Sequence, residues 1–93
     1  MALFANTALV TGTDSQGMGQ AIARTLAGLG ADVALHWYRS REAAEVLSGE
    51  LTTIGRRAPV IGGDLGDAAT ARAVGRQAID ALGGIGSLFV TRA

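Results

Sequence analysis

The chain has 93 residues with one histidine and no cysteine, and its eight acidic and eight basic residues leave a formal charge of zero. This balance, without any run of basic residues, argues against a nucleic-acid-binding or membrane-binding surface. A metal site is not expected either, because thiolate ligands and a second histidine are both missing from the sequence.

The length predicts a single domain spanning residues 1–93. No apolar run approaches the roughly 18 residues that a membrane span requires, and Met1–Asn6 lacks the basic start of a signal peptide. We therefore expect a cytoplasmic protein. Every basic residue is an arginine, so chemistry that needs a lysine would have to find it on another chain.

The first predicted unit is a strand, a glycine-containing turn and a helix. The apolar run Thr7–Thr11 has strand length, as expected for a strand covered on both faces. Gly12, Gly17 and Gly19 follow, and a helical period begins directly after them. The amides at a helix start stabilise a bound anion, so this turn is the predicted ligand site. The predicted inner face of the helix consists of Ile22, Ala23, Leu26 and Leu29.

The second predicted unit is the strand Asp32–Trp37 followed by a helix. Ser40 is placed to cap this helix, and Gly55 closes it. Arg56 and Arg57 are then most simply interpreted as a solvated turn. The predicted inner face of the helix consists of Ala44, Leu47, Leu51 and Ile54.

The third predicted strand is Ala58–Gly62, with Pro59 near its start, where a missing amide N–H is tolerated. Asp67 is predicted to cap the next helix, and Ser87–Val90 is the fourth predicted strand. The predicted inner face of the third helix consists of Ala71, Val74, Ala78 and Leu82.

The alternation of strands and helices predicts an α/β, Rossmann-like, doubly wound parallel sheet with four strands in the order 3-2-1-4 and three helices. In that order a ligand binds in the crevice between strands 1 and 4. The fourth strand lies at an apolar edge of the sheet, and such edges pair with other chains. We therefore expect self-association or a second protein chain at this edge.

Four landmarks carry a family resemblance across nearly the whole chain. The loop Thr11–Gly19 is similar to the T-G-x-x-x-G-x-G loop of the short-chain dehydrogenase/reductase family. The segments Trp37–Ser40, Gly63–Leu65 and Gly84–Val90 stand where that family has its next three landmarks. They correspond to the nucleotide-binding first half of such an enzyme.

The resemblance implies a dinucleotide site in the glycine loop. Its expected residues are Gly12, Ser15, Gly17, Met18 and Gly19. In the family the glycines admit the pyrophosphate, and the apolar residue between the last two packs near the dinucleotide. This chain has four residues between its first two glycines where the family usually has three. The extra residue bulges outward or fills the phosphate space.

The residues that follow the second predicted strand indicate which dinucleotide is bound. A carboxylate at this position would select NAD, but the sequence offers Arg39 and Ser40, with Arg41 adjacent. A guanidinium forms paired bonds to phosphate oxygens, so NADP(H) is the expected dinucleotide. The alternative is that both arginines are surface residues and that Ser40 only caps the helix.

Asp64 and Leu65 resemble the family residues that border the adenine ring, and the alternative for Asp64 is a turn aspartate. His36 and Trp37 are assigned to the sheet and its rim, because a single histidine on an apolar strand has no evident partner.

Catalysis is not expected from this chain alone. The family's serine, tyrosine and lysine lie beyond the fourth strand, and here the one tyrosine is Tyr38, with Glu42 four residues later and no lysine. The family's N-N-A-G after the fourth strand is replaced by residues 90–93, and Arg92 stands at the mouth of the crevice. No catalytic residue is assigned.

Three hypotheses follow. The chain is the NADP(H)-binding part of an oxidoreductase of ketones and alcohols, completed by a second chain that bears the catalytic residues. Alternatively it is a non-catalytic scaffold or assembly subunit with a degenerate nucleotide fold. A dinucleotide-responsive regulator is the third possibility.

Overall fold

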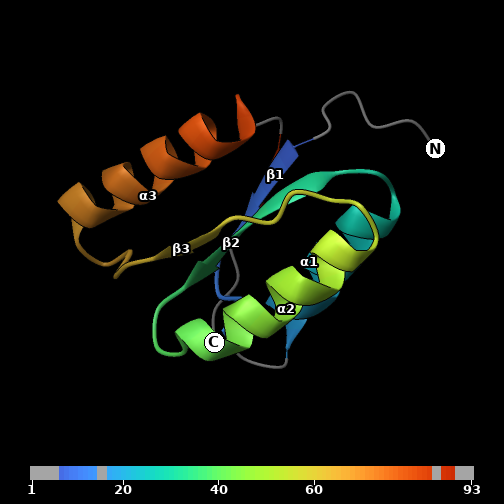
Figure 1. Ribbon diagram of the computed structural model, residues 1–93. Helices are drawn as coiled ribbons and strands as arrows, with labels where there is room; N and C mark the ends of the chain where they lie inside the picture. Colours follow the sequence, from blue (N-terminus) through green and yellow to red (C-terminus); the bar gives the residue numbers. More distant parts are fainter. Residues whose placement is uncertain (1–6, 15–16, 85–86, 90–93) are drawn as a thin grey trace.

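The fold alternates strands and helices in the described part of the chain (Figure 1). The computed structural model describes residues 7–14, 17–84 and 87–89, the last three by their backbone. Their elements are β1 (Thr7–Val10), α1 (Met18–Gly28), β2 (Asp32–Trp37), α2 (Arg41–Thr53), β3 (Val60–Gly62), α3 (Ala68–Leu82) and β4 (Ser87–Phe89).

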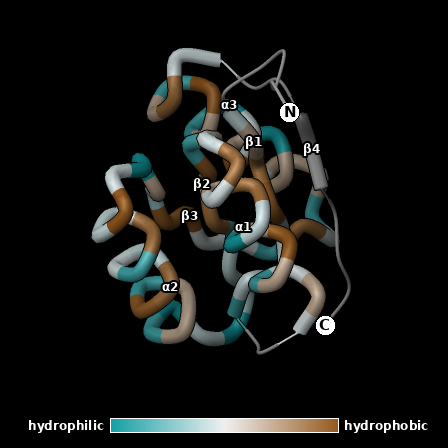
Figure 2. Tube along the Cα trace, turned by 90° about the vertical axis from the view of Figure 1, so that its right-hand side faces the viewer, coloured by the Kyte–Doolittle hydropathy of each residue, from teal (hydrophilic) through white to brown (hydrophobic). Residues whose placement is uncertain are grey.

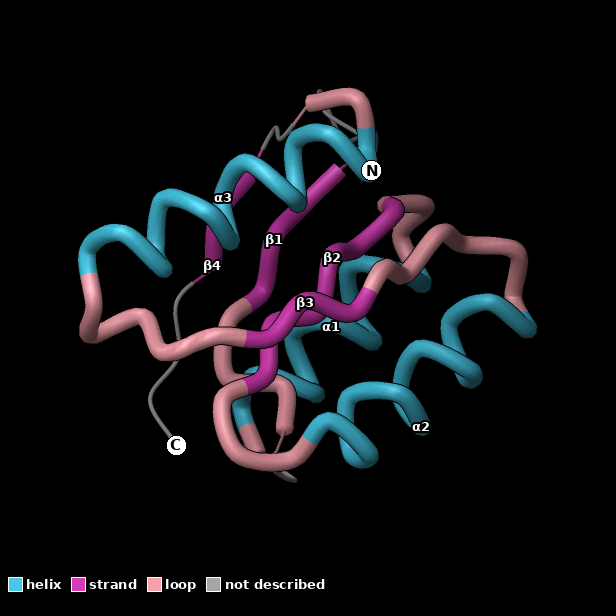
Figure 3. Tube along the Cα trace, turned by 60° about the vertical axis from the view of Figure 1, so that its left-hand side comes forward, coloured by secondary structure: helices cyan, strands magenta, loops and turns pink. Residues whose placement is uncertain are grey.

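All the strand pairs are parallel, and the sheet has the order β3-β2-β1-β4. Leu9 of β1 is paired with Ala34 of β2 and with Leu88 of β4. The carboxyl ends of the strands therefore meet at one edge, as Figure 3 allows the reader to follow. An α/β Rossmann-like fold with a parallel sheet and three helices is confirmed, and the predicted ligand site is the turn between β1 and α1.

The helices cover both faces of the sheet: α1 and α2 lie on one side and α3 on the other (Figures 1 and 2). The apolar cores under them are separate because strand side chains alternate between the two faces. The α1–α2 core consists of Val10, Ala23, Ala27, Ala31, Val33, Leu35, Leu47, Leu51 and Ala58. The α3 core consists of Leu9, Ala34, Ile61, Val74, Ala78 and Leu82.

The predicted inner faces of the first two helices are wrong at their ends. Leu29 is 41% exposed and Ile54 is 53% exposed. Each is the C-cap residue, one position beyond the last helical residue. The period of the sequence does not say at which residue a helix ends, so it does not show whether the last apolar residue of the stripe still packs against the sheet.

The third strand begins later than predicted, at Val60. Pro59 has no N–H to donate to a ladder, but its carbonyl oxygen accepts a hydrogen bond of 2.8 Å from Leu35 N–H. The chain therefore already runs along β2 before Val60, but only Val60–Gly62 form the strand β3.

Arg57 is exposed, as expected of a solvated segment, but the side chains of both Arg56 and Arg57 have structural partners that the sequence did not predict. Arg56 Nε donates to the carbonyl oxygen of Ala27, in the last turn of α1. Arg57 bonds the Asp32 carboxylate through its amide and Nε, and its other guanidinium nitrogens reach two carbonyl oxygens at the end of α3. Arg57 therefore serves carbonyls at the end of α3, where helical donors are missing, whereas the Ala27 carbonyl that Arg56 reaches also accepts from Gly30 N–H. In the described ranges, none of the helices combines the length and the apolar character of a membrane span.

Candidate functional site

The turn between β1 and α1 leaves the start of α1 open to an anion. Gly12 has a φ of 69°, in the left-handed region that favours glycine. Gly17 is the N-cap residue of α1 and has no side chain with which to cap the first amides. The first turn of the helix also carries no acidic residue to offset the positive end of the dipole.

The structure places Gly17, Met18 and Gly19 together at the start of α1. Gly17 and Met18 are exposed, Met18 by 71%, whereas Gly19 is buried. Ser15, and Gln16 beside it, lie outside the described residues. Gln20 is buried in the first turn, where its Nε2 donates to the carbonyl oxygen of Thr13 at 3.0 Å. This bond holds the start of α1 against the turn.

Asp14 reaches from this turn to the end of β2. Its Oδ2 accepts hydrogen bonds from the amides of Tyr38 and Ser40, at 3.0 and 3.2 Å, and from the amide of Arg39 between them. Burial by itself would raise the pKa of Asp14, but these backbone amides together hold the pKa below its ordinary value near 3.8. A fixed carboxylate therefore lies at the end of β2.

Ser40 and the two arginines beside it have different surroundings. Ser40 is the N-cap residue of α2, and its Oγ accepts from Ala43 N–H at 3.3 Å. Arg41 pairs with Glu45 one turn later, at 2.8 Å. Within the described ranges Arg39 pairs with no carboxylate, and its guanidinium lies over the Tyr38 ring, 5.8 Å from the centroid.

Asp64 and Leu65 lie in the turn after β3. The Asp64 carboxylate accepts from Gly66 N–H at 2.8 Å, so it builds the turn, as the alternative interpretation expected. Leu65 is partly buried against the α3 core.

His36 connects three strand ends and is only 3% exposed. Its Nδ1 accepts from Gly12 N–H at 3.3 Å, after β1. Its Nε2 lies 2.7 Å from the carbonyl oxygen of Gly63, after β3. Its own carbonyl oxygen accepts from the amide and the hydroxyl of Thr13, both at 2.9 Å. The assignment of this residue to the sheet is confirmed, and the structure adds its contacts to both turns.

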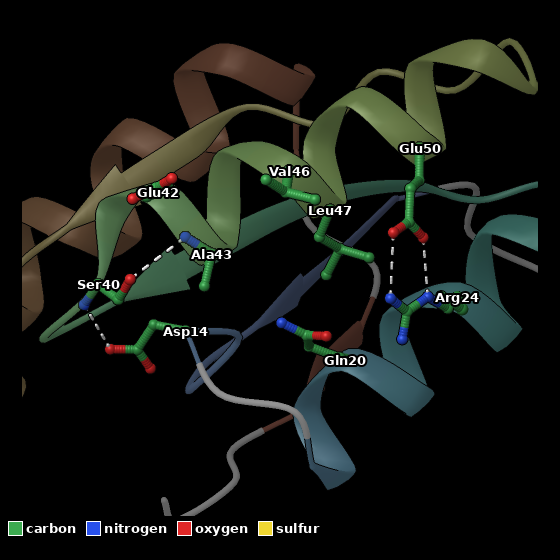
Figure 4. A pocket seen from close by; sticks show the side chains of 9 residues that line it. All are labelled: Asp14, Gln20, Arg24, Ser40, Glu42, Ala43, Val46, Leu47 and Glu50. Atoms are coloured by element: carbon green, nitrogen blue, oxygen red, sulfur yellow. Dashed lines mark hydrogen bonds and ion pairs between the residues drawn. The ribbon is translucent and has the colours of Figure 1, made fainter.

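A cavity of about 420 Å³ opens between α1 and α2, next to the β1–α1 turn (Figure 4). Asp14 and Ser40 lie at one end of it and the ion pair of Arg24 with Glu50, at 2.9 Å, lies at the other. Its lining residues are Asp14, Gln20, Arg24, Ser40, Glu42, Ala43, Val46, Leu47 and Glu50.

Three carboxylates and one guanidinium give this cavity a negative lining. The guanidinium is already engaged by Glu50 through two hydrogen bonds. The cavity is therefore a poor place for a phosphate. Within the described part of the chain, no three His, Asp or Glu side chains are grouped so that they could hold a metal ion.

Sequence reasoning missed the roles of Asp14, Gln20 and His36. Asp14 and His36 join segments that are distant in sequence, so no local pattern reveals their partners, whereas Gln20 bonds Thr13 within the same turn. The sequence carried only weak signals for two of these roles. Asp14 is an acidic residue inside the glycine loop, and His36, the single histidine of the chain, lies near the end of an apolar strand.

Known proteins share both the sequence pattern and the fold. The model of the short chain dehydrogenase family matches residues 6–91. A blue fluorescent protein from a metagenomic library, solved with NADPH, is 40% identical over 89% of this chain with a TM-score of 0.84. A short chain dehydrogenase from Burkholderia cenocepacia, solved with NADP, is 40% identical over 87% of this chain with a TM-score of 0.83. A short-chain dehydrogenase/reductase from Serratia marcescens, in an F98A/F202L variant, is 34% identical over 92% of this chain with a TM-score of 0.86.

The chain spans about a third of the length of these structures, with 34%, 33% and 35% of the respective chains covered.

Proposed function

The chain belongs to the short-chain dehydrogenase family, and from this we propose that it supplies the NADP(H)-binding part of an oxidoreductase acting on ketones or alcohols. The observation that carries the proposal is the open start of α1. There a glycine N-cap, the absence of acidic residues in the first turn and a left-handed Gly12 create a place where a pyrophosphate is stabilised.

We assign the pyrophosphate to the backbone of Gly12, Gly17 and Gly19. Gly19 is buried in the first turn of α1, where the lack of a side chain lets the helix lie close to the sheet, and Met18 is exposed beside it. Ser15 is proposed as a further contact from the same loop.

We assign the 2'-phosphate of NADP(H) to Arg39, with the hydroxyl of Ser40 beside it. Arg39 is exposed and pairs with no carboxylate in the described ranges, whereas Arg41 is engaged by Glu45. A guanidinium without a carboxylate partner gives a phosphate a charge-assisted partner at no cost in broken ion pairs. We place the adenine beside Asp64 and Leu65, in the turn after β3.

The test is a fluorescence titration of the purified chain with NADPH and with NADH. We expect Arg39→Ala to weaken NADPH binding by roughly tenfold or more, the value of one charged contact, and to change NADH binding by less than about twofold. Arg41→Ala is the matched control, because it removes the same charge two residues later. Equal losses of NADPH and NADH affinity in Arg39→Ala would refute the assignment.

We further propose that hydride transfer needs residues that this sequence lacks, since it contains no lysine and its one tyrosine is Tyr38. A second chain or a second copy would pair with β4, which lies at the edge of the sheet. The measurement is the mass of the purified chain in solution, together with the identification of a partner that bears a Tyr-x-x-x-Lys pair. A monodisperse monomer that recruits no such partner would argue against it.

A non-catalytic assembly subunit remains the second candidate, and the observation that favours it is Asp14. Its carboxylate accepts hydrogen bonds from three backbone amides at the end of β2, so these amides are not free to bind a cofactor phosphate. If neither NADPH nor NADH binds in the titrations, the chain is better explained as a non-catalytic assembly subunit.

A further inference from the structure

We propose that His36, in its neutral form, is a positioning residue for the dinucleotide site and that dinucleotide binding is coupled to its protonation state. The inference rests on the proposed function, because the two turns that His36 joins are the ones assigned to the pyrophosphate and to the adenine.

The partners of the ring determine its tautomer. The Gly63 carbonyl oxygen can only accept, so His36 Nε2 carries the proton across their 2.7 Å contact. Gly12 N–H can only donate, so Nδ1 must offer a lone pair at 3.3 Å. A neutral imidazole protonated on Nε2 satisfies both groups, and the ring has no other protonation state that does.

This ring sets the spacing between the two turns. Gly12 is the first residue after β1 with a positive φ, and Gly63, whose φ is 155°, directly precedes Asp64. The backbone of His36 adds two hydrogen bonds from Thr13, so the β1–α1 turn is held to β2 at two successive residues. A shift of the ring would therefore move the backbone that faces the ligand.

Protonation would break this arrangement. It would place a second N–H at Nδ1, facing the Gly12 N–H, and two donors cannot bond each other. The turn would have to move away or lose the bond, while the ring is almost fully buried.

Other ionisable groups near His36 are already engaged or exposed. Asp14 and Asp64, in the two turns, accept hydrogen bonds from backbone amides. Tyr38 and Arg39 follow on the same strand end and are exposed. On α3, the residues that lie against Gly63 are Thr70 and Val74, and neither ionises.

The test uses the fact that His36 is the only histidine of the chain, so every imidazole signal in a ¹⁵N-detected NMR titration belongs to it. Without ligand at pH 7.5 we expect the neutral tautomer with the proton on Nε2. Because the protonated chain binds NADPH more weakly under this proposal, acid should weaken NADPH binding through His36 by about threefold.

A variant separates His36 from the 2'-phosphate, because a phosphomonoester also titrates near pH 6. His36→Asn keeps an acceptor for Gly12 N–H and carries no charge at any pH. We expect its NADPH affinity to fall less between pH 7.5 and 5.5 than that of the wild type, by about threefold. His36→Leu, which leaves both backbone partners unpaired, should lose about tenfold in NADPH affinity at pH 7.5. Ser48→Ala is the control, since it removes a partly buried side-chain bond to Ala58, before β3, and should leave NADPH binding unchanged.

The outcomes are distinguishable. Failure of the wild type to bind NADPH at pH 7.5 would overturn the proposed function and this inference together. NADPH binding with the proton found on Nδ1, or with a pH dependence that His36→Asn does not change, would overturn this inference alone.

Discussion

Asp14 accepts a hydrogen bond on its carboxylate from the amide of Ser40, the N-cap residue of α2, across 26 positions of sequence. The bond joins the turn after β1 to the end of β2, where the proposed site for the 2'-phosphate lies. The negative charge of Asp14 is thus fixed beside the proposed position of the negatively charged 2'-phosphate.

Removal of this charge should raise the preference for NADPH. Asp14→Asn keeps an oxygen that accepts from the amides but removes one unit of repulsion, worth about 1 kcal/mol at 4 Å in water. We expect the ratio of NADPH to NADH affinity to rise roughly fivefold, measured by fluorescence titration at constant salt. Glu42→Gln is the control, because Glu42 lines the same cavity but lies on the first turn of α2. An unchanged ratio in Asp14→Asn would place the phosphate away from this carboxylate.

Ser40 allows the cap and the cofactor contact to be separated. Ser40→Asp retains a good N-cap for α2 but adds a charge next to the proposed phosphate. Its free energy of unfolding should stay within about 0.5 kcal/mol of wild type, whereas NADPH binding should weaken by about fivefold and NADH binding should not. Ser40→Ala, in contrast, should lose about 1 kcal/mol of stability through the missing cap. Urea unfolding measures the stability, and the NADPH and NADH titrations measure the affinities. Normal NADPH binding by Ser40→Asp would mean that Ser40 caps α2 but does not contact the phosphate.

Acid should remove the contribution of Asp32 to stability. The Arg57 amide first, and its guanidinium next, hold the pKa of Asp32 below its ordinary value near 3.8. A lowered pKa means that the stabilisation is complete above the unfolded value and is lost as pH falls through the folded one. Asp32→Asn should therefore destabilise the protein by about 1 kcal/mol at pH 7, and the difference from wild type should shrink as the pH falls from 5 to 3.

Urea unfolding at several pH values measures this difference. The exposed Asp80 on α3 provides a matched control, since Asp80→Asn removes the same charge without breaking a hydrogen bond among the described residues. A difference between Asp32→Asn and wild type that persists undiminished at pH 3 would contradict the role of the Asp32–Arg57 contact.

Two glycines should respond in opposite directions to alanine. A Cβ on Gly62 would lie 2.4 Å from the indole ring of Trp37, so the ring has to move. Gly62→Ala should destabilise by about 1–3 kcal/mol. Gly49 lies inside α2 with nothing within 4 Å of an added Cβ, and Gly49→Ala should stabilise by about 0.5–1 kcal/mol. Thermal unfolding compares them, and a neutral Gly62→Ala would mean that the indole is free to shift.

The residues with local signals were predicted well. Ser40 and Asp67 both cap helices as expected, because a cap is made with an amide three residues ahead. The buried stripe of Val74, Ala78 and Leu82 follows from the period of a helix packed on one face. Leu29 and Ile54 failed because helical periodicity does not say at which residue the helix ends.

The sequence by itself determined the alternation of strands and helices and the open, glycine-lined start of α1, because hydrophobic period, caps and glycine conformation act over a few residues. Only the tertiary structure showed that Asp14 reaches the amides after β2, that Arg57 serves the end of α3, and that His36 spans two turns. Each of these contacts joins residues more than 20 positions apart, and their hydrogen-bond partners are backbone groups, which every residue carries. Such groups leave no mark in the sequence, so the parallel packing of the strand ends had to place them.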